Sequence, residues 1–387
     1  MAQAIAFRAF GAKTWNLEER ACFISNRLGI QPRCTLAPRG RIILSLMLEE
    51  IAEQPAALAR TIEAEREKIA RLGRFLKGRE IDLIVLVARG SSDNAALFGR
   101  YLLEITTGIP VSLSAPSVHT LYGAKLNLQH ALVIGVSQSG EGEDINQVLE
   151  NARAGGAYTV GITNEPSSSM VSLVDETLLM HGGRERSVAA TKTFTGQMML
   201  FYMLATELAE RSPAWSYETI PNFVAQALEQ QPAILELVQR YVFMENCVVV
   251  GRGLAYANAY ELALKFMETC YVVAERFSSA DFLHGPVAMV ERHFPVILFA
   301  PPGVMFAGVK SLIKRLRELR ADTLVLTSDL EAAADCSRSI IMPKEIDEFV
   351  APIPYIVPGQ LFAALLADAK GLDPDKPRSL SKVTRTL

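Results

Sequence analysis

Two serine-rich turns follow apolar runs in the first half of the chain, and their side chains are suited to hold a phosphate. The turn after residues 131–136 carries Ser137, Gln138 and Ser139. The turn after residues 81–88 carries Ser91 and Ser92. Hydroxyls, an amide and the N–H groups of glycine-containing backbone can bind an anion at a helix N-terminus without a lysine or arginine inside the loop. One such turn alone would more often be a plain polar connection, so the prediction of a phosphate site depends on both turns.

Acids and bases that could move protons stand in the second half. Glu261, Lys265 and Glu268 recur at i, i+4 and i+7, which places them on one face of an expected helix. His284 lies in a Gly-Pro turn, and Lys382 lies close to the carboxyl terminus. Each of these residues can be explained without a catalytic role. Helical Glu–Lys pairs are usually solvated, and single histidines or terminal lysines are usually structural or exposed. Together they are a candidate acid–base set.

The elements that must position these residues alternate between strands and helices. Apolar runs predict strands at residues 81–88, 111–114, 131–136, 158–163 and 176–180. Alternation of this kind indicates a parallel sheet with helices on both faces. Both serine turns then fall at the carboxyl ends of strands that could be neighbours, where open α/β sheets bind ligands.

A third loop, residues 185–195 with the sequence ERSVAATKTFT, leads into a long apolar helix. It could close over a ligand with the N–H groups of Val188 and Ala189. It could also be a simple helix cap, with Thr191 as the cap residue.

The second half of the chain repeats the first. CVVVGRG at 247–253 parallels VLVARG at 85–90, and residues 293–303, 321–329 and 339–342 parallel residues 130–140, 157–165 and 177–180 at a nearly constant offset. This repetition indicates duplication of one α/β unit. The second copy has Ala300, Pro301 and Pro302 where the first has its serine-rich turn, so only the first copy is expected to bind phosphate this way.

Length and composition indicate two α/β domains, residues 46–212 and 213–387, after an extension at 1–45 that we expect to be poorly ordered. A net charge of -3 gives no basic field for nucleic acid, and no apolar run is long enough to span a bilayer. Five scattered cysteines without a C-x-x-C pair indicate reduced thiols and a cytoplasmic protein, with neither disulfides nor a metal site.

Several motifs in order resemble the sugar isomerase (SIS) family, within it the isomerase half of glucosamine-6-phosphate synthases and the SIS-type glucosamine-6-phosphate deaminases. The matching stretches are ARGSSDNA, GVSQSGEGED, ERSVAATKTFTGQ, GRGLAYANAYELALKFMETCY, SSADFLHGP and PRSLSKVTRTL. The resemblance covers roughly residues 47–387. It implies two tandem SIS domains, each a parallel-sheet three-layer α/β/α sandwich.

The resemblance also implies roles for individual residues, with a sugar phosphate as the substrate and no cofactor or metal. The residues that would bind the phosphate are Ser92, Ser137, Gln138 and Ser139. Val188 would contact the sugar, and Glu268 would move a proton between C1 and C2 with Lys265 as its helix partner. His284 would assist ring opening and, in a homodimer, would reach the neighbouring subunit's site. Lys382 would engage the open-chain ketose as an imine, which requires a neutral amine.

Three departures from the synthase pattern are visible. Gly142 replaces a hydroxyl of the phosphate loop, Ala190 replaces a serine, and no glutaminase domain precedes the repeat. We therefore expect the hydrolytic direction, in which glucosamine 6-phosphate and water give fructose 6-phosphate and ammonia. The alternatives are a synthase-type isomerase or aminotransferase without its glutaminase domain, a deglycase of another 6-phosphorylated amine adduct, and a sugar-phosphate sensor without catalysis.

Overall fold

The computed structural model of the chain describes residues 45–382. Residues 1–44 and 383–387 lie outside the described part, and with them nearly all of the expected N-terminal extension as well as Cys22 and Cys34. The chain divides into two units, residues 1–43 and 44–387, and the description below concerns the second.

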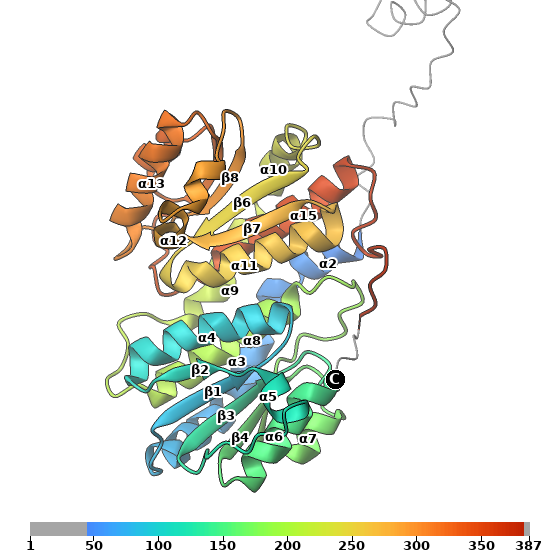
Figure 1. The fold of residues 1–387 in the computed structure, drawn as a ribbon, viewed down its shortest axis with the longest axis vertical. Helices are drawn as coiled ribbons and strands as arrows, with labels where there is room; N and C mark the ends of the chain where they lie inside the picture. The colour runs from blue at the N-terminus through green and yellow to red at the C-terminus, as the bar shows by residue number, and fades with distance from the viewer. Residues whose placement is uncertain (1–44, 383–387) are drawn as a thin grey trace, which may run out of the picture. The chain divides into compact units, whose positions relative to one another are not determined.

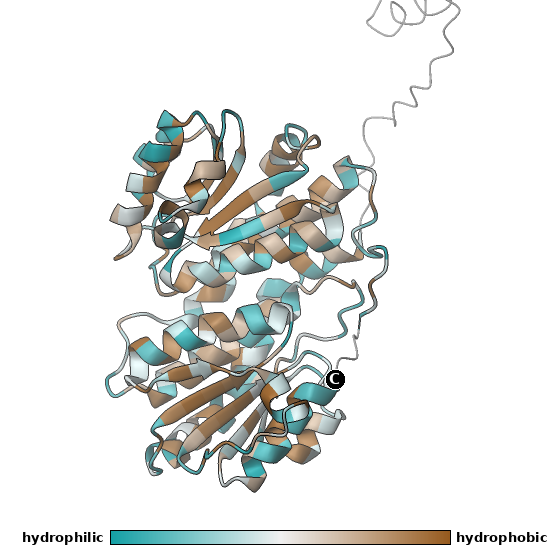
Figure 2. Ribbon diagram, in the orientation of Figure 1, coloured by the Kyte–Doolittle hydropathy of each residue, from teal (hydrophilic) through white to brown (hydrophobic). Residues whose placement is uncertain are grey.

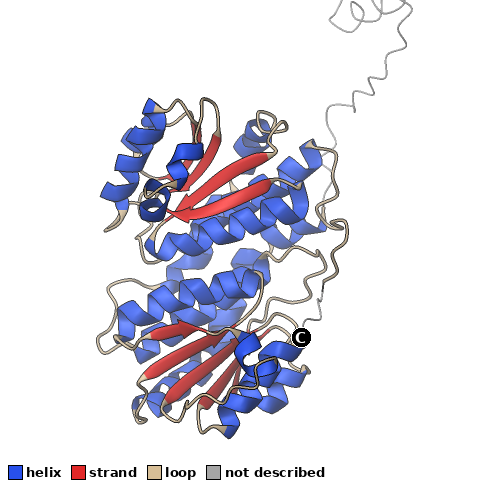
Figure 3. Cartoon of the chain, in the orientation of Figure 1, coloured by secondary structure: helices blue, strands red, loops and turns tan. Residues whose placement is uncertain are grey.

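Two five-stranded parallel sheets form the framework (Figure 3). The first sheet consists of β1 (Leu83–Val87), β2 (Val111–Leu113), β3 (Ala131–Val136), β4 (Tyr158–Thr163) and β5 (Glu176–Leu179). The second consists of β6 (Asn246–Gly251), β7 (Val273–Ser278), β8 (Pro295–Phe299), β9 (Asp322–Thr327) and β10 (Arg338–Ile341). The orders β2-β1-β3-β4-β5 and β7-β6-β8-β9-β10 are the same, which confirms the duplication predicted from the repeated segments.

The edge strand β7 was not predicted from the sequence. Its residues VAERFS include Glu275 and Arg276, and only Ala274 is fully buried. An edge strand needs no continuous apolar run, because one side of it faces solvent. A search for buried strands therefore passes over it.

The helices of the first half cover both faces of the first sheet (Figure 1). They are α2 (Leu46–Ala52), α3 (Gln54–Lys77), α4 (Ser91–Thr107), α5 (Pro116–Thr120), α6 (Glu143–Ala154), α7 (Ser169–Leu173) and α8 (Lys192–Leu208). Helices α3, α4 and α8 pack on one face, and α6 and α7 on the other. Pro55 lies in the first turn of α3, where its missing N–H costs no helical hydrogen bond.

The second sheet is covered in the same way. Its helical elements are η1 (Tyr217–Thr219), α9 (Ile220–Leu228), α10 (Gln231–Val238), η2 (Gly253–Ala255), α11 (Tyr256–Lys265), η3 (Phe266–Cys270), α12 (Ser279–Leu283), η4 (Pro286–Met289), α13 (Phe306–Glu318), α14 (Leu330–Asp335) and α15 (Pro352–Ala369). Helices α11 and α15 lie on one face, and α12, α13 and α14 on the other. Each half is therefore the three-layer α/β/α sandwich that was expected.

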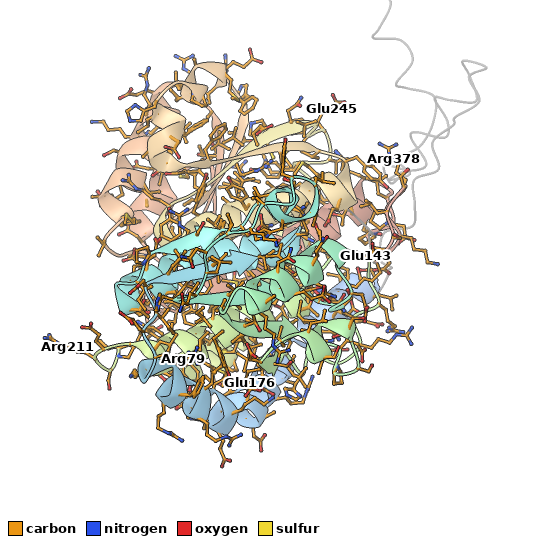
Figure 4. All side chains as sticks on the ribbon, turned by 60° about the horizontal axis from the view of Figure 1, so that its bottom comes forward. Arg79, Glu143, Glu176, Arg211, Glu245 and Arg378 are labelled. Carbon is orange, nitrogen blue, oxygen red and sulfur yellow. The ribbon has the colours of Figure 1, made fainter. Side chains whose placement is uncertain are left out.

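One apolar core joins the two halves. Leu132 and Ile134 of β3 belong to the same buried cluster as Ile297 and Phe299 of β8, through α8, α11 and α15. The opposite face of β3, with Val133, packs separately against α6. Figure 2 shows the strands as mostly hydrophobic, whereas Figure 4 shows charged side chains such as Arg79 and Arg211 on the outside. The halves share their inner helix layers as one interior.

No helix within residues 45–382 is long and apolar enough to cross a bilayer. Cys247, Cys270 and Cys336 are free thiols, and burial raises the pKa of all three, that of Cys270 and Cys336 to about 11. These three thiols are therefore protonated and unreactive near neutral pH.

Gly99 allows α4 to approach α8 closely. A Cβ atom at this position would lie 2.7 Å from ring atoms of Phe201, which is fully buried and cannot move aside. We expect Gly99→Ala to lower the free energy of unfolding by about 1–3 kcal/mol, although alanine favours a free helix by about 1 kcal/mol.

Urea unfolding measures this change. Gly78→Ala is the matched control, because the nearest atom to a Cβ there is 3.4 Å away. Equal stability of both variants would contradict the proposed close contact.

Candidate active site

A cavity of about 300 Å³ opens at the carboxyl ends of β1 and β3. These strands are hydrogen-bonded neighbours, as the sequence suggested, and the order 2-1-3-4-5 makes this point a topological switch. Seven of the predicted site residues line the cavity: Ser92, Ser137, Gln138, Ser139, Val188, Glu268 and Lys382. The structure thus gathers side chains from both halves of the chain at one place.

The serine hydroxyls of the cavity are oriented to donate. Ser137 Oγ accepts a hydrogen bond from the N–H of Gly140 (3.1 Å), and Ser139 Oγ accepts one from the N–H two residues on (3.3 Å). Ser92 Oγ accepts from the amide of Gln197 (2.9 Å). A hydroxyl that accepts from the protein keeps its own O–H free to donate. Three such hydroxyls form a set of neutral donors suited to an anion.

Gly142 and Arg89 modify this donor set. Gly142 precedes α6 without a side-chain cap, so the hydroxyl absent from the sequence is absent from the cavity wall too. Arg89, which sequence reasoning missed, lines the cavity and donates through Nε to the buried Asp144 (2.7 Å). The site therefore contains a guanidinium, although the serine loop itself has no cation. The signal in the sequence was the position of Arg89 directly before the turn that carries Ser91 and Ser92.

The candidate proton carrier Glu268 belongs to a buried charge cluster. Lys265 Nζ lies 2.6 Å from Glu268 Oε2 and 3.3 Å from Glu261 Oε1. Lys265 and Glu261 are fully buried, while the Glu268 side chain is 22% exposed and borders the cavity. The helix changes to π geometry at η3, directly after Lys265. The side chains predicted to share one face do meet, although the last of them stands on a π turn, a feature common at functional sites.

Helix α4 packs against α11 of the other half (Figure 1), and two of its residues complete this cluster. Ser91 Oγ donates to Glu261 Oε1 (2.9 Å), and Asn94 Nδ2 donates to Glu261 Oε2 (2.8 Å). Burial raises the pKa of Glu261, and Lys265 and Asn94 only partly offset this. Burial acts to lower the pKa of Lys265, but Glu261 and Glu268 more than offset it and raise this pKa.

Lys382 reaches the cavity from a carboxyl-terminal tail that is held at several points. The Asp375 carboxylate accepts from the N–H groups of Leu46 and Met47, each at 2.8 Å. The guanidinium of Arg378, labelled in Figure 4, lies 4.0 Å from the ring centre of Tyr271. These contacts bring the end of the described chain over the cavity.

The buried Glu185, a second residue that sequence reasoning missed, is the partner of Lys382. Lys382 Nζ donates to Glu185 Oε2 (2.7 Å) and to the carbonyl of Ser187 (2.8 Å). Glu185 also accepts from the N–H groups of Thr191 (2.9 Å) and Thr193 (3.2 Å), so it, and not the Thr191 side chain, caps α8. Burial acts to raise the pKa of Glu185, but Lys382 and these hydrogen bonds lower it overall.

The N–H of Val188, one of the two that could close over a ligand, has a partner within the chain. Val188 lines the cavity, and its N–H donates to the carbonyl of Asp375 in the tail (3.4 Å). In this conformation the tail therefore occupies that backbone donor.

His284 lies outside the cavity of its own chain. It is exposed at the end of α12, where its N–H donates to the carbonyl of Asp281 (3.1 Å). Lys265, by contrast, lies beneath the cavity wall and acts on it through Glu268.

In the matching loop of the second half, a carboxylate takes the place of a serine hydroxyl. In the first half, the N–H of Glu141 is bound by the Ser139 hydroxyl. At the corresponding position in the second half, the N–H of Val304 is bound by Glu348 Oε2 (2.6 Å), and the same oxygen packs against Gly303.

Replacement of Glu185 should destabilise the protein in a pH-dependent way. We expect Glu185→Gln to cost about 3 kcal/mol near neutral pH, because it leaves Lys382 and the start of α8 without their carboxylate. Since the folded pKa of Glu185 is lowered, the advantage of the native residue is full above about pH 4.5 and is lost as the pH falls through the folded pKa.

Denaturant unfolding at several pH values tests this expectation, with the exposed Glu245→Gln as control. A cost that stayed the same between pH 7 and pH 3 would contradict the proposed pairing.

Comparison with known proteins agrees with this architecture. The family model of the SIS domain matches residues 79–207 and 244–367. A glutamine–fructose-6-phosphate aminotransferase (isomerizing) from Gloeobacter violaceus is 37% identical over 353 residues, which cover 87% of this chain and 58% of that protein. The chain thus spans a little over half the length of this relative.

Two solved structures show the same fold. The C-terminal domain of the glucosamine-fructose-6-phosphate aminotransferase from Francisella tularensis superposes with a TM-score of 0.79 at 26% identity, over 87% of this chain and 99% of that one. A glucosamine-6-phosphate deaminase from Thermotoga maritima shares the fold with a TM-score of 0.67 at 22% identity, over 88% and 100% of the two chains. With two matched repeats, two sheets of identical strand order and the motifs of the sequence, the chain belongs to the SIS family.

Proposed function

We propose that the chain catalyses isomerisation of an amino-sugar 6-phosphate, in the manner of the isomerase part of the aminotransferases to which it is similar. The proposal rests on one cavity that combines three serine O–H donors with a carboxylate, Glu268, and an amine, Lys382. In the synthetic direction, fructose 6-phosphate and ammonia give glucosamine 6-phosphate and water. The reverse direction is the deamination expected from the sequence.

The serine hydroxyls and Arg89 would hold the phosphate at the switch point of the sheet. An anion at the start of α6 is also favoured by the helix dipole. Glu268 would then take a proton from one of the two carbons C1 and C2 and return it to the other, which requires a carboxylate next to an open-chain sugar. Lys265 supports this role because its buried ammonium lies 2.6 Å from Glu268 Oε2 and so fixes the position of the carboxylate.

Lys382 would engage the ketose carbonyl. An amine attacks a carbonyl only when neutral, so Lys382 must first give up a proton and leave Glu185. The carboxylate of Glu185 is then the nearest partner for the proton. His284 would serve the cavity of a second copy in a homodimer, consistent with its exposure and its distance from the cavity of its own chain.

The similarity to an aminotransferase at 37% identity supports the synthetic direction. The similarity to the deaminase, at 22% identity, concerns the fold and gives weaker support to deamination. Because one set of residues catalyses a reaction in both directions, the two readings differ in the net direction and not in the chemistry.

Removal of a serine hydroxyl should weaken phosphate binding. Ser92→Ala and Ser137→Ala each remove one donor to a charged ligand, which is worth about 1.5–3 kcal/mol, or a roughly 10- to 100-fold increase in Kd. Calorimetry with glucosamine 6-phosphate and with inorganic phosphate measures the change. Ser311→Ala on the exposed face of α13 is the control, and equal affinity of all variants would remove the phosphate from this cavity.

Turnover should depend on the two reactive side chains. We expect the native chain to interconvert fructose 6-phosphate plus ammonia with glucosamine 6-phosphate, and Glu268→Gln and Lys382→Ala each to lose at least about 100-fold in rate. A coupled assay run in both directions, without glutamine, measures this. Lys376→Ala, exposed in the same tail, is the control.

Two outcomes would change the assignment. Isomerisation of fructose 6-phosphate without ammonia incorporation would restrict the activity to aldose–ketose exchange. Tight phosphosugar binding without any turnover would indicate a sensor.

A further inference from the structure

Ser91 and Ser92 are consecutive residues whose hydroxyls serve different partners. Ser92 keeps its O–H for the cavity, as described above. Ser91 donates to Glu261 Oε1 (2.9 Å) and accepts from Lys265 Nζ (3.2 Å). A hydroxyl has one hydrogen to give, and that of Ser91 is directed to Glu261. Both serines line the cavity, but the hydrogen of the Ser91 hydroxyl is directed to the buried charges of α11.

The distances within the cluster show how the charge is shared. Glu261 receives three donors: Ser91, Asn94 and, more distantly, Lys265 at 3.3 Å. Glu268 Oε2 accepts a hydrogen bond from Lys265 Nζ at 2.6 Å. Because the two residues of α4 already satisfy Glu261, the ammonium can lie close to Glu268.

We propose that Ser91 is a positioning residue, whose hydroxyl binds Glu261 and Lys265 together and so keeps the Lys265 ammonium on Glu268. The assignment rests on the proposed function in that Glu268 is the group that moves the proton. It adds a coupling to that function, because the helix that presents Ser92 to the phosphate also sets the charge environment of Glu268 in the other half of the chain.

Loss of the hydroxyl would redistribute the charges. In Ser91→Ala the buried Glu261 Oε1 loses its best donor, and the ammonium of Lys265 moves toward Glu261 to replace it, since an uncompensated buried carboxylate is costly. Glu268 then loses its neighbouring cation. The other charged groups that face it are Arg89, Asp144 and Lys382 across the cavity, and Ser91→Ala alters none of them. A carboxylate that loses a cation takes up a proton at higher pH.

The experiment compares the native chain with Ser91→Ala and Ser91→Thr over a range of pH. For Ser91→Ala we expect kcat to fall by about tenfold or more, the acidic limb of the pH–rate profile to move to higher pH, and the Kd for inorganic phosphate to stay within about twofold. Ser91→Thr retains the hydroxyl and should restore both the rate and the profile. Asn94→Ala removes the other α4 donor to Glu261 and should move the acidic limb in the same direction, which gives a second variant should Ser91→Ala fold poorly.

A titration that needs no turnover separates this proposal from the proposed function. NMR follows the signal of the Glu268 carboxyl carbon in a chain whose glutamates carry ¹³C. The signal is assigned by its absence from the spectrum of Glu268→Gln. Suppose that the Glu268 titration moves to higher pH in Ser91→Ala, but the native chain turns over no sugar phosphate. This result would support Ser91 as a positioning residue and reject the proposed isomerase function. An active chain in which neither the titration nor the acidic limb moves would overturn the role of Ser91. A loss of phosphate affinity in Ser91→Ala as large as in Ser92→Ala would also overturn it, since Ser91 would then be a phosphate ligand.

Discussion

A lysine ammonium buried between two carboxylates is the interaction on which the rest of the site depends. Lys265 and Glu261 have no exposed side-chain surface, and removing such charges from water costs several kcal/mol for each ion. Close, fixed partners must offset that cost. Part of the compensation comes from the start of α4, which belongs to the other sheet. The relative position of α4 and α11 is therefore constrained by charge as well as by the apolar core that the halves share.

Much of the fold was predictable because buried parallel strands are continuous apolar runs. The strands β1, β3, β4, β6, β8 and β9 carry this signal, and the repeated order of segments predicted that the halves share one topology. The edge strand β7 carries mixed residues, so its identity depends on pairing with β6, which only the tertiary structure supplies. The start of α4 has a similar explanation: the helix begins at Ser91, within the serine turn that was expected after residues 81–88.

The candidate site was predictable as a set of residues, and less so as a set of contacts. The turns after β1 and β3, the acid–base face and the tail lysine do meet around one cavity. The pair Lys382–Glu185 joins residues 197 positions apart, and no local pattern specifies such a pairing. Local pattern also does not tell which of two adjacent serines binds the buried charges of α11. That choice depends on where α11 places a carboxylate, and therefore on the packing of the whole interior.

The Glu348 carboxylate in the second copy of the loop makes the two halves differ in how their loops are held. An anion attached to the chain is present at a very high effective concentration and cannot diffuse away. In the second copy, one backbone N–H of the loop is thus bound by a residue of its own chain. This contact does not depend on the supply of any small molecule, whereas the loop of the first copy leaves its serine hydroxyls at the wall of a cavity.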